Sequence, residues 1–447
     1  MTMRAILIAM ILSVVSIYWQ HLSSVIEGGS TLYALSTPPV PAIFCILLLI
    51  GAAPLLGKVL GKPLSKQELI VIFMFLVLAI PQVTWGVTEI LLPWMTTHVY
   101  FATPQNDLHK ITELLPKWYY PSDPDLIREM YEGSADGSVP WKPWLYPLGM
   151  WTILMTLMFF TGMCLVSMFR KQWADRERLR FPLLLLPISL VEKESPGSHV
   201  PFFRNPLVWI AFVLVFTHHI LNVMNAYNPS VAALKDFYRI GAIFTEEPWT
   251  AYHNVRFFYR PQVLGLAYFV SPDLLFSTWF SFLMQPTSTV IADVFGLRQD
   301  PSFPFSVEQG SGAFLAMLFV LCWVGRGQLA LIARKALTGD PSIDDSDERI
   351  PYRWSFFGAI GGFTAIIIWS HFSGFSPVFS IPYVFLLLGF GLVYSRVSAE
   401  GGIPAVWAFP FNEHKRMMFQ LLGTRRFIRS GDASDLVMLA SYSWMGR

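Results

Sequence analysis

The chain has 447 residues, of which 54% are hydrophobic and only 14% are charged. Soluble domains usually carry about 25% charged residues, so this composition excludes an ordinary soluble fold and is typical of a polytopic membrane protein. The formal net charge of +2 gives no basic field for nucleic acid. Three cysteines, far apart in apolar runs, offer neither a disulfide framework nor a Cys-x-x-Cys metal site.

Apolar runs along the chain are long enough to cross a bilayer as helices, which takes about 20 residues. We expect spans at 4–22, 40–60, 67–88, 147–169, 206–226, 310–330, 354–372 and 377–395. The first run is followed by no small-residue cleavage site, so it is predicted to be a retained helix rather than a signal peptide. The predicted fold class is all-α: a polytopic helical membrane protein of about eight spans, with re-entrant or half-inserted helical elements.

Lysine and arginine residues crowd three connections, at 58–66, 170–180 and 326–353. Cytoplasmic loops carry such an excess, so we expect all three on the cytoplasmic side together with the N-terminus. This requires that the apolar tract 262–295 does not change sides. We therefore predict a re-entrant hairpin there, turning at Ser271-Pro272-Asp273, where serine before proline is typical of a helix start. One long kinked helix that breaks the charge rule is the alternative.

The topology assigns the remaining segments. The N-terminal spans fill 1–100, and further spans fill 147–226 and 261–447. We expect 101–146 to be an external capping segment and 227–260 an external aromatic-rich loop. The predicted cytoplasmic segments are a 170–204 loop, with a short half-inserted or surface helix at 181–191, and a 331–353 loop. The acidic part of the second loop is interpreted as a mobile solvated linker, because the alternating ligand pattern and central glycine of a calcium loop are absent.

Ionisable and amide groups at membrane depth are the candidates for function. Asp273 would lie at the hairpin tip, where protonation could couple to transport. Glu308 and Gln309 lead into the span at 310 and could offer a carboxylate and an amide to a polar substrate. Arg396 and Glu400 are four residues apart and share a helix face. The alternatives are structural: first-turn carboxylates that favour the helix dipole, and an ion pair at a span end.

His218, Asn222 and Asn225 share a face of the span 206–226 by their spacing, so this face is predicted to look into the bundle. We favour hydrogen bonding between helices over a metal site, because no further ligands can be placed. Glu89 lies near the external end of its span and could line a vestibule, although an interfacial carboxylate needs no special role. Neither external segment, 101–146 or 227–260, carries a phosphate loop, zinc spacing or nucleophile elbow. We expect no enzyme, metal or cofactor.

The stretch at 170–194 reads RKQWADRERLRFPLLLLPISLVEKE, a basic loop that passes through Phe181-Pro182 into a short apolar helix. It resembles the oligopeptide transporter (OPT) superfamily. A closer resemblance is to an uncharacterised family of bacterial OPT-like membrane proteins, carried by this stretch and by YFATPQND, SVEQGSGAF and RVSAEGGIP. The resemblance implies a secondary-transporter-like fold in the cytoplasmic (inner) membrane. Members of that family continue beyond the point equivalent to Arg447, so the chain looks cut short.

The Ser-Gly that follows the Phe-Pro step in oligopeptide transporters is Leu183-Leu184 here, so their peptide or metal-chelate selectivity is not carried over. The expected function is secondary transport of a small polar or peptide-like solute, coupled to protons through a carboxylate among Asp273, Glu308 and Glu400. The expected partners are the bilayer and that solute, with no nucleic acid, and a homo-oligomer is left open. A membrane-embedded enzyme subunit handling lipid or envelope precursors, or a non-transporting scaffold, are the alternatives.

Overall fold

The computed structural model describes residues 2–26, 38–59, 61–135, 137–192, 202–233, 237–297, 300, 302–402, 413–423, 425–426, 435 and 437–438. Within it the chain forms two compact units, each assembled from separate stretches of sequence. Unit 1 consists of Met1–Pro81, Arg180–Ser306 and Ser398–Ala405, and unit 2 of Gln82–Leu179, Val307–Val397 and Val406–Arg447.

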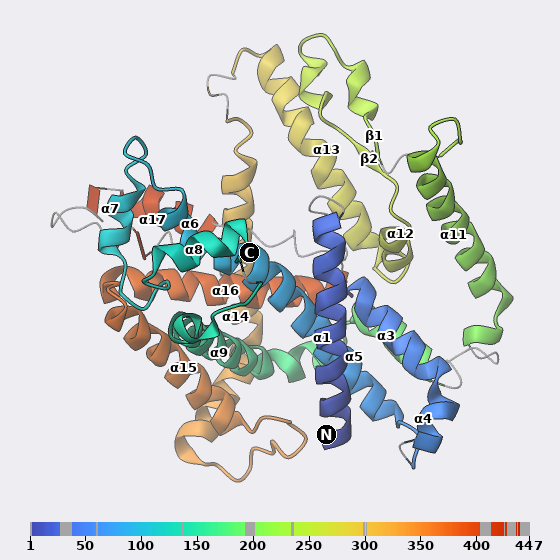
Figure 1. Ribbon diagram of the computed structural model, residues 1–447, viewed down its shortest axis with the longest axis horizontal. Helices are drawn as coiled ribbons and strands as arrows, with labels where there is room; N and C mark the ends of the chain where they lie inside the picture. Colours follow the sequence, from blue (N-terminus) through green and yellow to red (C-terminus); the bar gives the residue numbers. More distant parts are fainter. Residues whose placement is uncertain are drawn as a thin grey trace. The chain divides into compact units, whose positions relative to one another are not determined.

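The predicted all-α class is confirmed, because helices account for nearly all regular structure in the described ranges (Figure 1). Seven of these helices are long and apolar enough to cross a membrane. The spanning candidates are Met3–Val25, Lys66–Tyr100, Trp141–Arg176, Pro206–Tyr227, Ser306–Thr338, Tyr352–Phe372 and Pro377–Gly401.

Unit 1 begins with the N-terminal helices. Its helices are α1 (Met3–Ile26), α3 (Val40–Gly51), α4 (Ala53–Val59), α5 (Lys66–Pro81), α10 (Pro182–Val191), α11 (Pro206–Tyr227), α12 (Pro261–Ala267) and α13 (Pro272–Val294). Unit 2 holds the π-helical segments η1 (Gln82–Leu91) and η2 (Gln172–Arg176). Its α-helices are α6 (Leu92–Tyr100), α7 (Leu108–Leu114), α8 (Pro124–Glu132), α9 (Trp141–Lys171), α14 (Ser306–Thr338, from Val307 on), α15 (Tyr352–Phe372), α16 (Pro377–Gly401, as far as Val397) and α17 (Glu413–Leu422).

The predicted single span at 40–60 is wrong. The helix stops at Gly51 and a separate helix, α4, starts at Ala53. Glycine at 51 and proline at 54 are the two residue types that suit a helix interior least, which accounts for the break between them. At 12 residues, α3 is too short to cross a bilayer by itself.

The core of unit 1 lies where α1, α3, α5 and α10 pack together. Ala5 and Ala9 of α1 are fully buried, and such small residues let neighbouring helices approach closely. Leu190 and Val191 of α10 belong to the same buried cluster. The short helix predicted at 181–191 therefore exists and packs against the bundle, while the part of its loop from 193 to 201 lies outside the described residues.

The start of α10 is fixed by an unusual backbone. Phe181 has a left-handed φ of 46°, and its amide donates a hydrogen bond to the carbonyl of Ala399, 3.1 Å away. Gly402 lies so close to Pro182 that a Cβ on the glycine would be 2.6 Å from the proline Cβ. Pro182 is the first helical residue, which needs no amide hydrogen. Unit 1 thus joins the beginning of α10 to the end of α16.

The N-termini of α1 and α5 are tied by a nearly buried carboxylate. Glu68 is 5% exposed and pairs with Arg4 at 2.6 Å between Oε2 and Nη2. Its Oε1 accepts from the Thr2 hydroxyl at 2.6 Å. Ser65 and Glu68 also form a capping box, in which the Ser65 amide donates to Glu68 and the Glu68 amide donates to the Ser65 hydroxyl.

We expect Arg4→Gln to destabilise the protein by about 2 kcal/mol, because it leaves the Glu68 carboxylate without its cation. The measurement is thermal unfolding in detergent, with Arg128→Gln as control, since the Arg128–Asp125 pair is 59% and 75% exposed. Equal unfolding temperatures for both variants would contradict the role of this contact.

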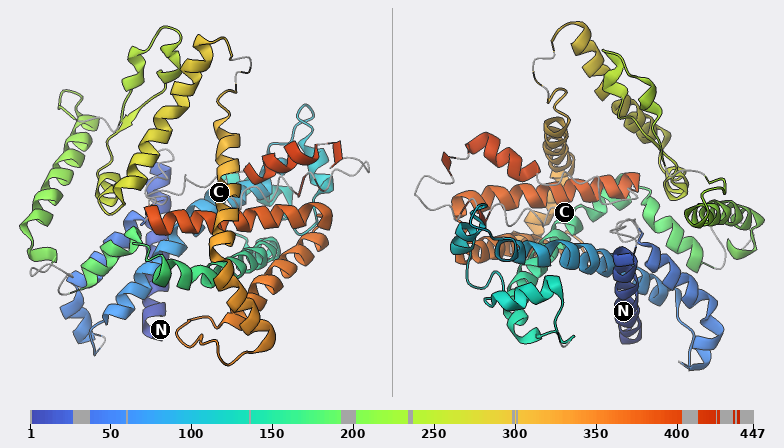
Figure 2. Two further views of the ribbon diagram at one scale, coloured as in Figure 1. Left: turned by 180° about the vertical axis from the view of Figure 1, so that it is seen from behind. Right: turned by 45° about the horizontal axis from the view of Figure 1, so that its top comes forward.

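The segment from 237 to 294 contains one short β-hairpin pairing as well as helices. Strands β1 (Phe237–Tyr238) and β2 (Phe257–Phe258) pair antiparallel before α12. Pro272 is the first residue of α13, as predicted, and the chain reverses direction between α12 and α13 (Figures 1 and 2). The two arms are unequal, with seven residues in α12 and 23 in α13. Re-entry into the membrane stays a prediction.

In unit 2 the predicted capping segment is a folded subdomain. Helices α7 and α8 pack on α6, and an aromatic cluster of Trp118, Tyr119, Trp151 and Trp369 lies beneath them. The indole of Trp151 donates to the carbonyl of Tyr119 at 3.2 Å. This cluster joins the segment to α9 and α15, which pack along each other.

Candidate functional site at one end of unit 2

The loop between α14 and α15 is fixed by polar contacts, which differs from the predicted mobile linker. Lys335 donates to the Asp340 carbonyl at 2.9 Å, and Arg334 pairs with the Asp340 carboxylate at 2.7 Å. Hydrogen bonds from the hydroxyl and amide of Ser342 hold the pKa of Asp340 below its ordinary value, with Arg334 adding to the effect. Asp345 accepts from the Tyr352 amide at 2.9 Å. Alternating short polar residues here build turns rather than a free linker.

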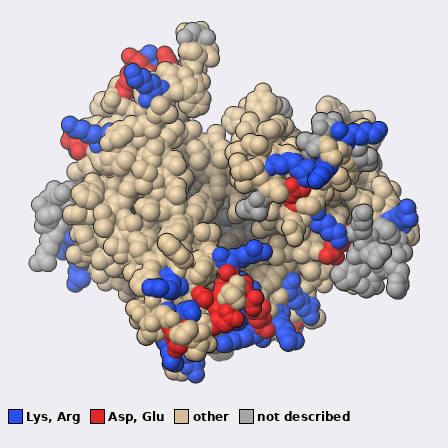
Figure 3. Space-filling view, turned by 90° about the horizontal axis from the view of Figure 1, so that it is seen from below, with Lys and Arg blue, Asp and Glu red and all other residues tan. Residues whose placement is uncertain are grey.

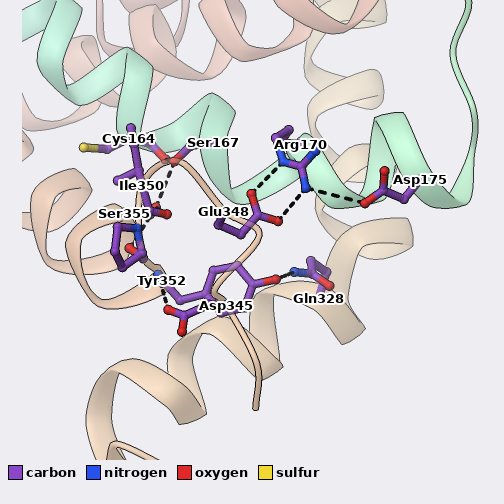
Figure 4. Close-up of polar contacts among 11 residues, drawn as sticks. Cys164, Ser167, Arg170, Asp175, Gln328, Asp345, Glu348, Ile350, Tyr352 and Ser355 are labelled. Atoms are coloured by element: carbon purple, nitrogen blue, oxygen red, sulfur yellow. Dashed lines mark hydrogen bonds and ion pairs between the residues drawn. The ribbon is translucent and has the colours of Figure 1, made fainter. Parts of the chain in front are cut away.

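A bidentate ion pair joins this loop to the end of α9 (Figure 4). The Arg170 guanidinium donates from Nε to Glu348 Oε2 at 2.6 Å and from Nη2 to Oε1 at 3.0 Å. The Glu348 side chain is only 4% exposed, whereas that of Arg170 is 41% exposed. Nearby, the buried side chains of Gln328 and Tyr352 are joined by a hydrogen bond of 3.0 Å. Helices α9, α14 and α15 therefore meet in one polar cluster.

The π-helical turn η2 extends this cluster towards α16. Arg396 Nη2 lies 2.8 Å from Glu177 Oε2, and both side chains are largely buried. Gln172 donates from Nε2 to Glu177 Oε1 at 2.9 Å and accepts from Arg176 at 3.3 Å. A weaker contact of 3.5 Å links Arg170, at the end of α9, to Asp175 of η2. We call the contacts around Arg170–Glu348 and Arg396–Glu177 the polar end cluster.

The polar end cluster bears on the predicted topology. It contains residues from both basic segments, 170–180 and 326–353, in direct contact. These segments lie at the same end of unit 2, as the charge rule predicted. In the view from below, acidic and basic side chains gather in one patch near the lower edge, and smaller groups of charged side chains lie elsewhere on this face (Figure 3). Which side of the membrane this end faces stays a prediction.

Arg396 and Glu400 lie one turn apart on the unbroken helix α16, so they share a helix face as predicted. Arg396 also forms an ion pair with Glu177, which was not predicted. Glu177 was not predicted as a functional residue, because it lies in a charged loop whose sequence indicates exposure to solvent.

The three candidate carboxylates are not gathered in one unit. Asp273 is exposed in the first turn of α13, in unit 1 with Glu400. Glu308 and Gln309 are exposed in the first turn of α14, in unit 2. Glu308 makes a long contact with another side chain, accepting from Gln420 Nε2 at 3.5 Å. Both carboxylates occupy positions where the structural alternative, a first-turn acid, also applies.

The predicted polar face of α11 makes contacts within the helix and to the loop after it. His218 Nε2 lies 3.4 Å from Asn222 Nδ2, and the buried His218 ring packs edge-on against Tyr259. Asn225 donates to the carbonyl of Val231 at 2.6 Å. The Asn225 contact holds the start of the loop that follows α11. No group of three or more His, Cys, Asp or Glu suited to a metal ion occurs in the described part of the chain.

The π-helical segment η1 was not anticipated. It continues the spanning helix begun by α5 and carries Glu89, which is partly buried. Long π-helical stretches are rare and frequently mark functional sites. The sequence signal was present in Gln82, Thr84 and Thr88, polar residues that interrupt the apolar run ahead of Glu89.

A second unanticipated group is the histidine of α17. His414 is 0% exposed, and its Nε2 lies 2.9 Å from the Tyr383 hydroxyl of α16. Burial lowers the pKa of His414 to about 4, and the neighbouring Lys415 adds to the effect. The imidazole is therefore neutral at pH 7, where it holds α17 against α16.

We expect acidification from pH 7 to pH 5 to destabilise the protein by about 2 kcal/mol through His414. The unfolded histidine titrates near 6.5 and the folded one near 4, so stability is present above 6.5 and is lost as the pH falls towards 4. The measurement is the unfolding temperature against pH. His414→Phe should flatten this dependence, while the exposed His109→Phe should leave it; identical slopes in both variants would contradict the assignment.

Together the apolar helices and their interhelical packing define the class: an all-α, multi-pass membrane protein. The chain belongs to the Family of unknown function (DUF6785), whose model matches residues 1–447. Comparisons with curated proteins and with solved structures give no match.

Proposed function

We propose that the protein is a secondary transporter of a small polar or peptide-like solute, coupled to protons and similar in architecture to OPT proteins of the cytoplasmic membrane. The observation that carries the proposal is the polar end cluster. Its two ion pairs join α9, α16 and the α14–α15 loop at one end of unit 2.

Alternating access requires contacts at an end of the bundle that form in one state and break in another. Ion pairs suit this role because water can replace the partner when the helices part. Arg170 is already 41% exposed, so its guanidinium can be solvated without further rearrangement. Glu348, at 4% exposed, gains hydration only if the loop moves. We therefore propose that the cluster alternates between this packed arrangement and a hydrated one.

Interrupted helices give further support. The break between α3 and α4, the π-helical η1 and the short α10 all replace continuous α-helix in an apolar sequence. Such interruptions release backbone groups that can bind a solute where protein or a water-filled cavity surrounds them. The proposed proton carriers remain Asp273, Glu308 and Glu400. To these we add Glu177 and Glu348, because protonation of either carboxylate would break its ion pair with arginine.

The test is solute uptake into proteoliposomes under an imposed pH gradient, using a panel of small polar solutes, peptides and metal chelates. We expect one class to accumulate when the gradient is present and to equilibrate without accumulation when an ionophore collapses it. Protein-free liposomes are the control. A folded, correctly inserted protein that accumulates no member of the panel would contradict the proposal.

A further inference from the structure

An apolar groove lies between α16 and α17 in unit 2, with a volume of about 360 Å³. Residues from both helices and from the turn after α17 line it. The lining consists of Val378, Phe379, Pro382, Leu386, Met418, Leu421, Leu422 and Arg426. All of these are apolar except Arg426, so the lining of the groove is hydrophobic apart from one guanidinium group.

The helix that forms one wall of the groove is amphipathic. His414 and Met418 are buried against α16, while Lys415 and Arg416 carry positive charge along the same ten residues. Leu421 is 75% exposed even though it lines the groove. A short amphipathic helix with basic residues on its polar side is typical of segments that lie in the membrane interface.

The other wall is a spanning helix. Val378, at the start of α16, is 73% exposed, and α16 is among the helices long and apolar enough to cross a bilayer. The groove therefore opens beside a segment whose natural surroundings are lipid. Its size suits an acyl chain or a comparable small ligand.

The positive charge of the groove indicates which polar group its ligand carries. Arg426 is exposed, and no carboxylate among the described residues pairs with it. Guanidinium groups bind phosphate oxygens through paired hydrogen bonds, and basic pockets beside transmembrane helices bind lipid head groups. An apolar groove with one such group matches a ligand that has a phosphate at one end and a hydrocarbon chain at the other.

We propose that the groove between α16 and α17 binds an anionic phospholipid, with an acyl chain between Phe379 and Met418 and the phosphate on Arg426. The lipid fills the groove and ties α17 to the spanning helix. This site is separate from the polar end cluster and does not depend on transport.

The test measures binding of dioleoyl phosphatidylglycerol to the full chain in detergent by native mass spectrometry, with dioleoyl phosphatidylcholine as the zwitterionic comparison. Arg426→Gln should weaken phosphatidylglycerol binding about tenfold and remove its advantage over phosphatidylcholine. Leu421→Trp, which places a large ring in the groove from an exposed position, should weaken both lipids. The matched control is Arg425→Gln, an exposed neighbouring arginine that does not line the groove.

Unchanged phosphatidylglycerol binding in both Arg426→Gln and Leu421→Trp would overturn the proposal. Inorganic phosphate is the further probe: if it displaces the lipid at millimolar concentration, the site recognises phosphate alone and the acyl groove is not part of it. Equal losses in Arg425→Gln and Arg426→Gln would show only general attraction to anionic lipid, which also contradicts the assigned site. Circular dichroism confirms that each variant keeps its helices.

Discussion

Gly362→Leu is expected to separate α9 from α15 and to destabilise the protein by about 3 kcal/mol. A Cβ at Gly362 would collide with the Thr161 hydroxyl, and one at Gly358 would lie 2.7 Å from Cys164 Sγ. These two glycines, four residues apart on α15, let the helices approach as small residues do in membrane bundles. Both helices also support the polar end cluster.

The measurement is thermal unfolding in detergent, compared with Gly361→Leu. A Cβ at Gly361 meets nothing within 4 Å, so Gly361→Leu causes no collision. It changes the helix propensity of α15 in the same way as Gly362→Leu. We expect Gly361→Leu to unfold near the wild-type temperature. Equal behaviour of the two variants would mean that α9 and α15 do not pack through this face.

The second large effect is expected for Arg396→Ala, which should destabilise the protein by about 3 kcal/mol. The Arg396 side chain is 11% exposed and that of Glu177 is 24% exposed, so removal of the cation leaves a carboxylate in poorly hydrated surroundings. Glu177→Ala should also destabilise the protein, because it removes the carboxylate that pairs with the largely buried guanidinium. Thermal unfolding measures both.

A double-mutant cycle separates the ion pair from its surroundings. If Arg396 and Glu177 act on each other, the combined Arg396→Ala and Glu177→Ala variant should be more stable than the sum of the single losses predicts. Exchanging the two residues, Arg396→Glu with Glu177→Arg, should recover part of the stability. Strict additivity of the single losses would contradict a direct interaction.

Much of the fold could be predicted from the sequence, because long apolar runs leave few alternatives in a bilayer. The run at 352–372 forms one helix, as its composition indicates, and Pro272 begins α13 where serine before proline predicted a start. Hydropathy alone missed the break at Ala52, since Gly51 and a proline three residues on do not lower the mean hydropathy enough to divide the run.

The candidate site could be predicted only in part. Arg396 was identified because a charge near the end of an apolar helix stands out. Its partner Glu177 and the Arg170–Glu348 pair could not be found, because those pairs join residues far apart in the chain, 178 positions in the second case. A local spacing rule could point only to Glu400 on the same helix, whereas the fold brings Glu177, which follows η2, beside Arg396.

The α14–α15 loop was interpreted as solvated for the same reason: its partners lie far away in the sequence or on neighbouring helix ends. Asp340, Asp345 and Glu348 look like a free acidic stretch when read alone, and only the folded helices bring Arg334, Lys335 and Arg170 beside them. A charged loop between spanning helices therefore deserves a search for partners at the neighbouring helix ends.

The central claim is that the polar end cluster opens during transport, and chemical cross-linking tests it most directly. Arg396→Cys and Glu177→Cys are combined in a Cys322→Ser background, since Cys322 is the exposed native cysteine, and joined by a short reducible bifunctional reagent. Proteoliposomes with the reduced pair should take up the solute identified in the panel. Cross-linking should abolish uptake, and reduction should restore it. Uptake at the same rate with the cross-link in place would contradict the account.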